Sequence, residues 1–331
     1  MSSMIASGSW FKFSLSKFLQ LRLNNFLFRF LPFALSRWYL ALLGKVFYFF
    51  KRKEKKLICQ TLTHVLKGKL SGKALKRKIK DTFQGIFDHY HEKLFVGYSN
   101  FPKLLKFLKT QVYFEGEDKL KEALGQGKGV ILVTGHFGAV ELLPGALAVQ
   151  GYPASMICRF QTSRLREALS KRAEDVGLNL IDADEGNIVL AAMKALKQGR
   201  ILITECDEFD EWRQDPHRQT FFLNCKLGSD RTLDLLQKRS GAQVVTALMR
   251  RAGNKTYNCG LEVMINGAGG RLPLGEQCLQ TLEAMVEAYP EQWYQWKKFG
   301  QMIKGRFEVE YADRQVGYLA PEAGISVPHQ A

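Results

Sequence analysis

The sequence predicts an α/β fold with a mostly parallel central sheet flanked by helices, preceded by an N-terminal membrane-associated helical segment. Two observations predict this fold class. From residue 110 onward, short apolar runs of strand length alternate with runs whose apolar residues recur at helical spacing. Before residue 110, large apolar side chains are mixed with many basic ones. The chain has 331 residues and is 46% hydrophobic, which is enough for a sizeable core.

The positive charge is concentrated in the N-terminal third of the chain. Residues 1–110 hold 22 Lys and Arg but 4 Asp and Glu, whereas the remainder holds 26 and 28, for a net charge of +16 overall. Basic residues mixed with large apolar ones suit an anionic membrane surface. Nucleic acid is the competing partner for a basic protein. We disfavour it, because the aromatic residues occur in apolar runs rather than singly in a polar groove.

Composition divides the chain into four predicted segments. They are a membrane-anchoring segment with a basic flank at 1–56, a basic helical region at 57–110, an α/β domain at 111–315 and a polar tail at 316–331.

The first segment is expected to lie in the membrane interface. Charges such as Arg37 and Lys45 interrupt its apolar runs, and no uncharged run approaches the roughly 18 residues of a spanning helix. We expect one or two amphipathic helices with a break at Pro32. A single spanning helix whose arginines reach back to the interface is the alternative. The basic run at 51–56 would place the rest of the chain in the cytoplasm.

The second segment is predicted to be helical over 74–109. Ile79, Phe83, Ile86 and Tyr90 recur at helical spacing there. The many lysines between 67 and 80 form either a solvated helix face or a contact with an anionic partner.

From 110 onward we expect strands and helices in alternation. Strands are predicted at 112–116, 130–134, 154–158, 178–181, 201–205, 243–249 and 257–265, with a short extended piece at 221–223. Helices are predicted at 118–125, from the turn after 136 to about 150, and at 163–176, 186–198, 233–240 and 277–289. Sites in such sheets gather at the carboxyl ends of the strands.

His136 stands where the strand 130–134 gives way to a helix, and Glu141 follows five residues later. Residues five apart on a helix point about 140° away from each other, so the two side chains meet only if His136 lies on the turn. Gly135 and Gly138 supply freedom for such a turn. A neutral imidazole can take a proton from an attacking hydroxyl, and a carboxylate can fix its tautomer. A buried turn histidine and a surface glutamate are the structural alternative.

No serine or cysteine nucleophile is obvious near His136, which favours direct transfer of an acyl group to an acceptor hydroxyl. Cys158 is the nearest cysteine. The six cysteines form no C-x2-C pair or other metal-ligand spacing, so no metal site is predicted from them. Scattered free thiols fit a reducing compartment.

Residues 134–141, with the sequence T-G-H-F-G-A-V-E, resemble the H-x4-E block of the late acyltransferases of lipid A biosynthesis. These are the lauroyl- and myristoyl-transferring branch of the lysophospholipid acyltransferase superfamily. Glycerolipid acyltransferases usually have Asp at the last position, so Glu141 favours the lipid A branch. The resemblance continues through Arg159, the segment 199–207 and Gly228, and ends with P-E-Q-W-Y-Q-W at 290–296.

This resemblance implies a glycerolipid-acyltransferase-like fold and a set of site residues. His136 would be the general base and Glu141 its orienting acid. Arg159 would clamp the phosphorylated head of the acceptor, since its guanidinium suits phosphate, although a solvated arginine is the simpler interpretation. Asp207 matches an acidic residue that follows proline in the family, but Cys206 stands in place of that proline. A helix cap is the alternative role for Asp207.

Gly228 is the remaining substrate-binding candidate. The family has a glycine turn before a helix at this point, where a helix N-terminus can hold an anionic group. A plain turn is the alternative.

The expected activity is transfer of a fatty acyl chain from an acyl carrier protein thioester to a hydroxyl of a lipid A precursor. It would take place at the cytoplasmic face of the inner membrane. Acyl carrier protein, the membrane lipid acceptor and the anionic membrane surface are the expected partners, with no nucleic acid. No cofactor is expected, because a thioester is already activated. The alternatives are another acceptor lipid, such as an amino-acid lipid or a glycolipid, and a non-catalytic membrane-associated homologue.

Overall fold

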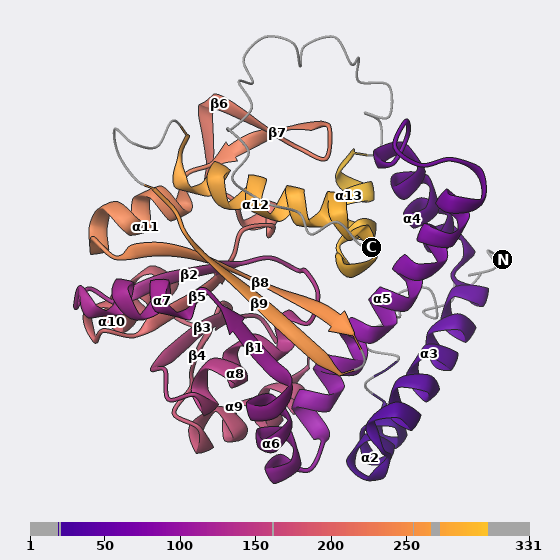
Figure 1. Ribbon diagram of the computed structural model, residues 1–331, viewed down its shortest axis with the longest axis horizontal. Helices are drawn as coiled ribbons and strands as arrows, with labels where there is room; N and C mark the ends of the chain where they lie inside the picture. Colours follow the sequence, from indigo (N-terminus) through magenta and orange to yellow (C-terminus); the bar gives the residue numbers. More distant parts are fainter. Residues whose placement is uncertain (1–18, 20, 161, 254, 266–271, 304–331) are drawn as a thin grey trace, which may run out of the picture.

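The computed structural model describes residues 19, 21–160, 162–253, 255–265 and 272–303 (Figure 1). The predicted polar tail at 316–331 lies outside the described residues, and so do residues 1–18 of the predicted anchoring segment.

A seven-stranded sheet forms the centre of the molecule, in the order β1-β9-β8-β2-β5-β3-β4. Every neighbouring pair is parallel except β8 and β9, so the predicted α/β fold with a mostly parallel sheet is confirmed. The strands are β1 (Val112–Glu115), β2 (Val130–Thr134), β3 (Ala154–Cys158), β4 (Asn179–Asp182), β5 (Ile201–Glu205), β8 (Gln243–Gly253) and β9 (Thr256–Val263).

Two hairpins depart from the parallel pattern. The link between β8 and β9 is too short for a crossover, so these two strands run antiparallel. Strands β6 (Gln214–Phe222) and β7 (Cys225–Asp230) form a separate two-stranded antiparallel sheet. Leu223 and Asn224 connect these two strands, and both have positive φ, as a tight hairpin turn requires. The sequence pattern indicated only an extended piece at 221–223.

Helices cover both faces of the sheet, and β2 shows how the core is divided. Val130 and Leu132 pack into one apolar cluster with α6, α7 and α8, whereas Ile131 and Val133 pack into the other with α10, α11 and α12. All five residues of β2 are buried, as expected for a central parallel strand. The helices are α6 (Phe101–Gln111), α7 (Glu117–Gly125), α8 (Leu143–Val149), α9 (Ser163–Asp175), α10 (Ile188–Lys197), α11 (Thr232–Ser240), α12 (Leu274–Ala288) and α13 (Trp296–Ile303).

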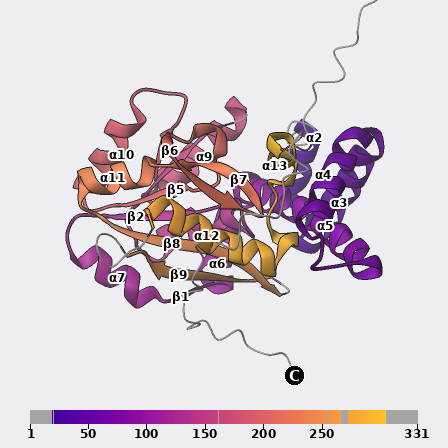
Figure 2. The same cartoon turned by 90° about the horizontal axis from the view of Figure 1, so that it is seen from above.

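The N-terminal helices gather at one end of this α/β body (Figures 1 and 2). The break predicted at Pro32 is present, because Pro32 is the N-cap of α3. At Gly85 the long helix α5 approaches the body so closely that a Cβ atom would lie 1.7 Å from the carbonyl oxygen of Glu291. The helices are α2 (Arg22–Phe30), α3 (Phe33–Phe50), α4 (Arg52–Val65) and α5 (Gly72–Tyr98).

Within the described ranges, no helix combines the length and the apolar character that crossing a bilayer requires.

Candidate active site

The turn that follows β2 is held on two sides. Gly138 has φ of 56°, and a Cβ atom there would lie 1.7 Å from the carbonyl oxygen of Met249 on β8. Its backbone nitrogen donates to the carbonyl oxygen of Gln292 at 2.7 Å, and Phe137 forms an antiparallel bridge with Trp293. Glycine is needed at 138 because the backbone is left-handed and leaves no room for a side chain. The turn is therefore fixed between β8 and the segment 292–294.

This turn presents His136 to the buried carboxylate of Asp207. Nδ1 of His136 lies 2.8 Å from Oδ1 of Asp207. The backbone nitrogen of His136 donates to the same carboxylate at 3.0 and 3.1 Å, and Nε1 of Trp293 donates to Oδ2 at 2.8 Å. Asp207 is fully buried. A carboxylate held by these donors fixes the imidazole with Nδ1 protonated and leaves Nε2 directed elsewhere.

Glu141 does not occupy the orienting position predicted for it. Its carboxylate accepts from Nζ of Lys93 at 3.0 Å and lies 3.7 Å from Nε2 of His89, both on α5. Across the residues described, no hydrogen bond or ion pair joins Glu141 to His136. The reason is the turn itself, since it aims the His136 ring at the residues after β5, while Glu141 sits on η2 (Val140–Leu142) against α5.

Two further carboxylates face the other ring nitrogen. Nε2 of His136 lies 3.1 Å from Oε1 of Glu208 and 3.4 Å from Oε2 of Glu205. Burial alone would lower the pKa of His136, but the charges of Glu205 and Asp207 outweigh it and raise that pKa well above 6.5. The ring therefore holds its second proton at neutral pH.

The same cluster separates the pKa values of the two glutamates. Burial, with Asp207 and Glu208 nearby, raises the pKa of Glu205 to about 7, despite the opposing effect of His136. Burial also favours a higher pKa for Glu208, but hydrogen bonds from His136 and Lys298 outweigh it and lower that pKa to about 2. Glu208 stays ionised at neutral pH, whereas Glu205 can exchange a proton there.

Tyr294 forms the wall beside His136. Its ring stacks on His89 with centroids 3.3 Å apart and meets His136 edge-on at 5.1 Å. Its backbone nitrogen donates to the carbonyl oxygen of His136 at 3.3 Å.

A cavity of about 550 Å³ opens from this cluster, within the range of about 300–1,000 Å³ for ligand pockets. His136, Glu205 and Glu208 stand on its polar part, with Lys93 and Lys298 nearby. Most of the remaining wall is apolar. Its side chains come from α5, α6, α8, α9, β3, β4 and the loop before β4, among them Val96, Leu104, Leu108, Pro144, Met156, Leu165, Leu169, Val176, Leu178 and Leu180. The arrangement joins an acid–base pair to an apolar chamber.

Residues 24–298 match the model of the family described as bacterial lipid A biosynthesis acyltransferase. That match spans most of the chain, including the His136 turn, Asp207 and the segment 292–294. The chain belongs to this acyltransferase family. Comparison with curated proteins gives no match.

Of the other two residues predicted for the site of this acyltransferase, one lines the cavity and the other does not. Arg159 lies at the cavity wall, where Nε contacts Asp184 at 2.8 Å and Nη1 contacts Glu211 at 2.7 Å. The guanidinium of Arg159, which was expected to bind phosphate, is thus paired with two carboxylates. Gly228 lies within strand β7 rather than on a turn before a helix, and it is not part of the cavity wall.

Four residues that contact His136, Asp207 or Glu208 were not predicted as site residues: Glu205, Glu208, Trp293 and Lys298. The register of β2 and β5 would have revealed the first two, because Thr134 pairs with Glu205. His136 follows Thr134 by two residues, and Asp207 follows Glu205 by two residues. Both therefore lie at the carboxyl ends of neighbouring strands.

Proposed function

We propose that this acyltransferase moves a fatty acyl chain from an acyl carrier protein thioester to a hydroxyl of a lipid A precursor, with His136 as the general base. The observation that carries the proposal is the Asp207–His136 pair, 2.8 Å apart, at the polar part of a largely apolar cavity. Asp207 acts as the positioning residue, in place of Glu141.

The reaction needs one proton carrier and no enzyme nucleophile. Nε2 of neutral His136 accepts the proton of the acceptor hydroxyl while that oxygen attacks the thioester carbonyl. The tetrahedral intermediate then collapses, the carbon–sulfur bond breaks, and the imidazolium returns the proton to the leaving thiolate. The products are an ester and a free thiol. Asp207 stabilises the imidazolium between the two steps.

The acceptor hydroxyl takes the position that Glu208 holds at Nε2 in the free enzyme. His136 is protonated there, so it must lose this proton before it can act as a base. Glu205, 3.4 Å away and with a pKa of about 7, is suited to receive it. Because Glu208 is paired with Lys298, its carboxylate keeps a cation when it leaves the ring.

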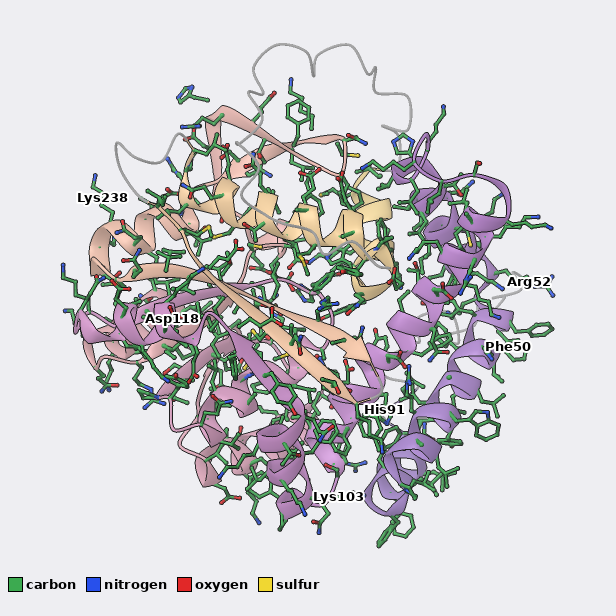
Figure 3. All side chains as sticks on the ribbon, viewed as in Figure 1. Phe50, Arg52, His91, Lys103, Asp118 and Lys238 are labelled. Carbon is green, nitrogen blue, oxygen red and sulfur yellow. The ribbon has the colours of Figure 1, made fainter. Side chains whose placement is uncertain are left out.

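Membrane association is proposed through the outer face of α2 and α3. Large apolar side chains are exposed there in a stripe at helical spacing: Leu23, Phe26, Phe30, Leu35, Trp38, Leu42, Val46, Phe49 and Phe50. Figure 3 shows Phe50 and Arg52 directed away from the body. Exposed apolar residues in such number mark an interaction surface, and the basic residues beside them favour anionic lipid over a protein partner. The proposed location is the cytoplasmic face of the inner membrane.

The first experiment is mass spectrometry of lipid A from cells with and without the gene, complemented by wild type or by His136→Ala. We expect loss of one secondary acyl chain that only the wild-type gene restores. An unchanged profile in cells without redundant acyltransferases would contradict the lipid A acceptor. Full rescue by His136→Ala, at equal protein level, would contradict the base assignment.

A further inference from the structure

Three ligand-type atoms converge on one point at the polar part of the cavity. They are Nε2 of His136, Oε2 of Glu205 and Oε1 of Glu208, all within 4.8 Å of one another. Nε2 is 3.4 Å from the first carboxylate oxygen and 3.1 Å from the second.

These separations fit a tetrahedral metal ion. Zinc binds histidine nitrogen and carboxylate oxygen at about 2.0–2.2 Å, which places neighbouring ligand atoms roughly 3.3–3.5 Å apart. The two distances from Nε2 lie at or close to this range, and the two carboxylate oxygens lie within 4.8 Å of each other, so an ion between the three atoms requires side-chain adjustments but no backbone rearrangement. The fourth position would face the cavity, as in sites that keep one place open for water or substrate.

The surroundings of the ligands are also those of a metal site. Nδ1 of His136 is hydrogen-bonded to Asp207, and a carboxylate on the far nitrogen is the usual partner of a metal-binding histidine. Asp207 is held in turn by Trp293. The second oxygen of Glu208 is paired with Lys298, which leaves its first oxygen directed at the shared point. Two of the three ligands are therefore oriented in advance.

The negative charges of Glu205 and Glu208 favour a cation at this point. Within the described part of the chain, the one ion-pair partner found for Glu205 is the His136 ring. If the ring's second proton leaves the cluster altogether, the lone pair of Nε2 faces two carboxylates, an arrangement that is unfavourable in a buried place. Either a proton or a metal ion relieves it.

We propose that His136, Glu205 and Glu208 bind one divalent transition-metal ion, with Zn²⁺ the best fit to an N, O, O ligand set. The ion competes with the proton at Nε2, so binding weakens as pH falls. We also expect the bound ion to inhibit acyl transfer, because it occupies the nitrogen that would accept the proton. This expectation rests on the proposed function. The binding itself does not depend on that function. The sequence spacing could not show this site, because 69 positions separate His136 from Glu205.

The test is isothermal titration calorimetry of the purified, chelator-treated chain with Zn²⁺ at pH 8 and pH 6. Mg²⁺ is the second probe. We expect one ion per chain, tighter binding at pH 8 and no comparable Mg²⁺ binding. Glu205→Gln and Glu208→Gln should each weaken binding at least about tenfold, and His136→Ala should remove it. Glu141→Gln is the matched control, since this carboxylate lines the same cavity outside the cluster, and it should bind as wild type does.

X-ray absorption at the zinc edge identifies the ligand atoms, which matters because the chain has six free cysteines. Nitrogen and oxygen ligands support the site. Sulfur ligands, unchanged binding in all three variants, or no binding at millimolar Zn²⁺ would each overturn it. If zinc binds through these ligands but does not slow acyl transfer, the metal site stands and the base assignment falls.

Discussion

At the scale of single residues, the hydrogen bond that Nδ1 of His136 donates to Asp207 determines which carboxylate works with the proposed base. Asp207→Asn keeps the size of the side chain but cannot stabilise the imidazolium and favours the wrong tautomer. We expect kcat to fall by about 10³–10⁴-fold, as when the acid of a hydrolase triad is changed to its amide. The measurement is the rate of acyl transfer from an acyl carrier protein thioester.

Glu141→Gln is the matched control for this prediction. It removes the charge that faces Lys93 and leaves the His136 ring untouched, so we expect a loss of less than about tenfold. A larger loss from Glu141→Gln than from Asp207→Asn, with both variants folded by circular dichroism, would show that Glu141 orients the base.

A second residue-scale prediction concerns pH. The pKa of His136 is raised well above 6.5, and in the proposed mechanism the neutral ring is the active form, so kcat/KM should fall as pH drops through that raised value. The charge of Glu205 contributes most to this rise in pKa, so Glu205→Gln should move the acidic limb of the profile to lower pH. Glu122→Gln, an exposed carboxylate outside the cavity wall, should leave the limb in place. An unmoved limb in Glu205→Gln would contradict this coupling.

The single-residue predictions from sequence succeeded where local context was enough. His136 was placed on a turn after a buried strand, and it lies there. Its partner was assigned by nearness in sequence, whereas Asp207 reaches it across neighbouring strands 71 positions later. Gly228 was expected before a helix, but the hairpin of β6 and β7 includes it in a strand. Both differences come from strand pairing, which a local pattern does not contain.

At the scale of elements, the turn after β2 depends on the glycine at 138. Gly138→Ala adds strain from a left-handed backbone and a clash with the carbonyl oxygen of Met249. We expect the free energy of unfolding to fall by more than about 3 kcal/mol. Gly151→Ala has the same sign of φ with open space around it and should cost about 1 kcal/mol. Urea denaturation of the two variants compares them, and equal losses would contradict a steric role for Gly138.

The helix α3 carries the element-scale test of membrane binding. Trp38→Glu and Phe49→Glu place charge on the exposed apolar stripe and should reduce flotation with anionic vesicles by about tenfold or more, because buried apolar area contributes to interfacial binding. Tyr113→Glu, an exposed aromatic on β1, is the control and should float as wild type does. Equal flotation of all three variants would remove α3 from the membrane contact.

Most strands and helices followed from hydrophobic periodicity, because their burial imposes it. β2, β3 and β5 have the predicted bounds. The hairpin of β6 and β7 was missed because Gln214, Asp215, His217 and Arg218 make most of β6 polar. The helix α13 was also missed, since its short run follows the tryptophan-rich segment directly.

At the scale of the whole molecule, charge is separated along the chain, and binding to anionic vesicles should weaken as salt is raised. Arg52→Glu with Lys56→Glu should reduce that binding and its salt dependence. Lys238→Glu with Arg239→Glu makes the same charge change on the opposite side of the molecule (Figure 3) and should have little effect. Equal effects of the two pairs would mean that net charge, rather than its placement, controls binding.

The contacts that hold the His136 turn and Asp207 come from residues that are synthesised late. Gln292 accepts a hydrogen bond from the turn and Trp293 donates one to Asp207, yet the ribosome adds both about 85 residues after Asp207. A growing chain that stops short of them lacks both fastenings, although its strands β2 and β5 are already complete. The Asp207–His136 pair can therefore gain these two contacts only after residues 292 and 293 have been synthesised.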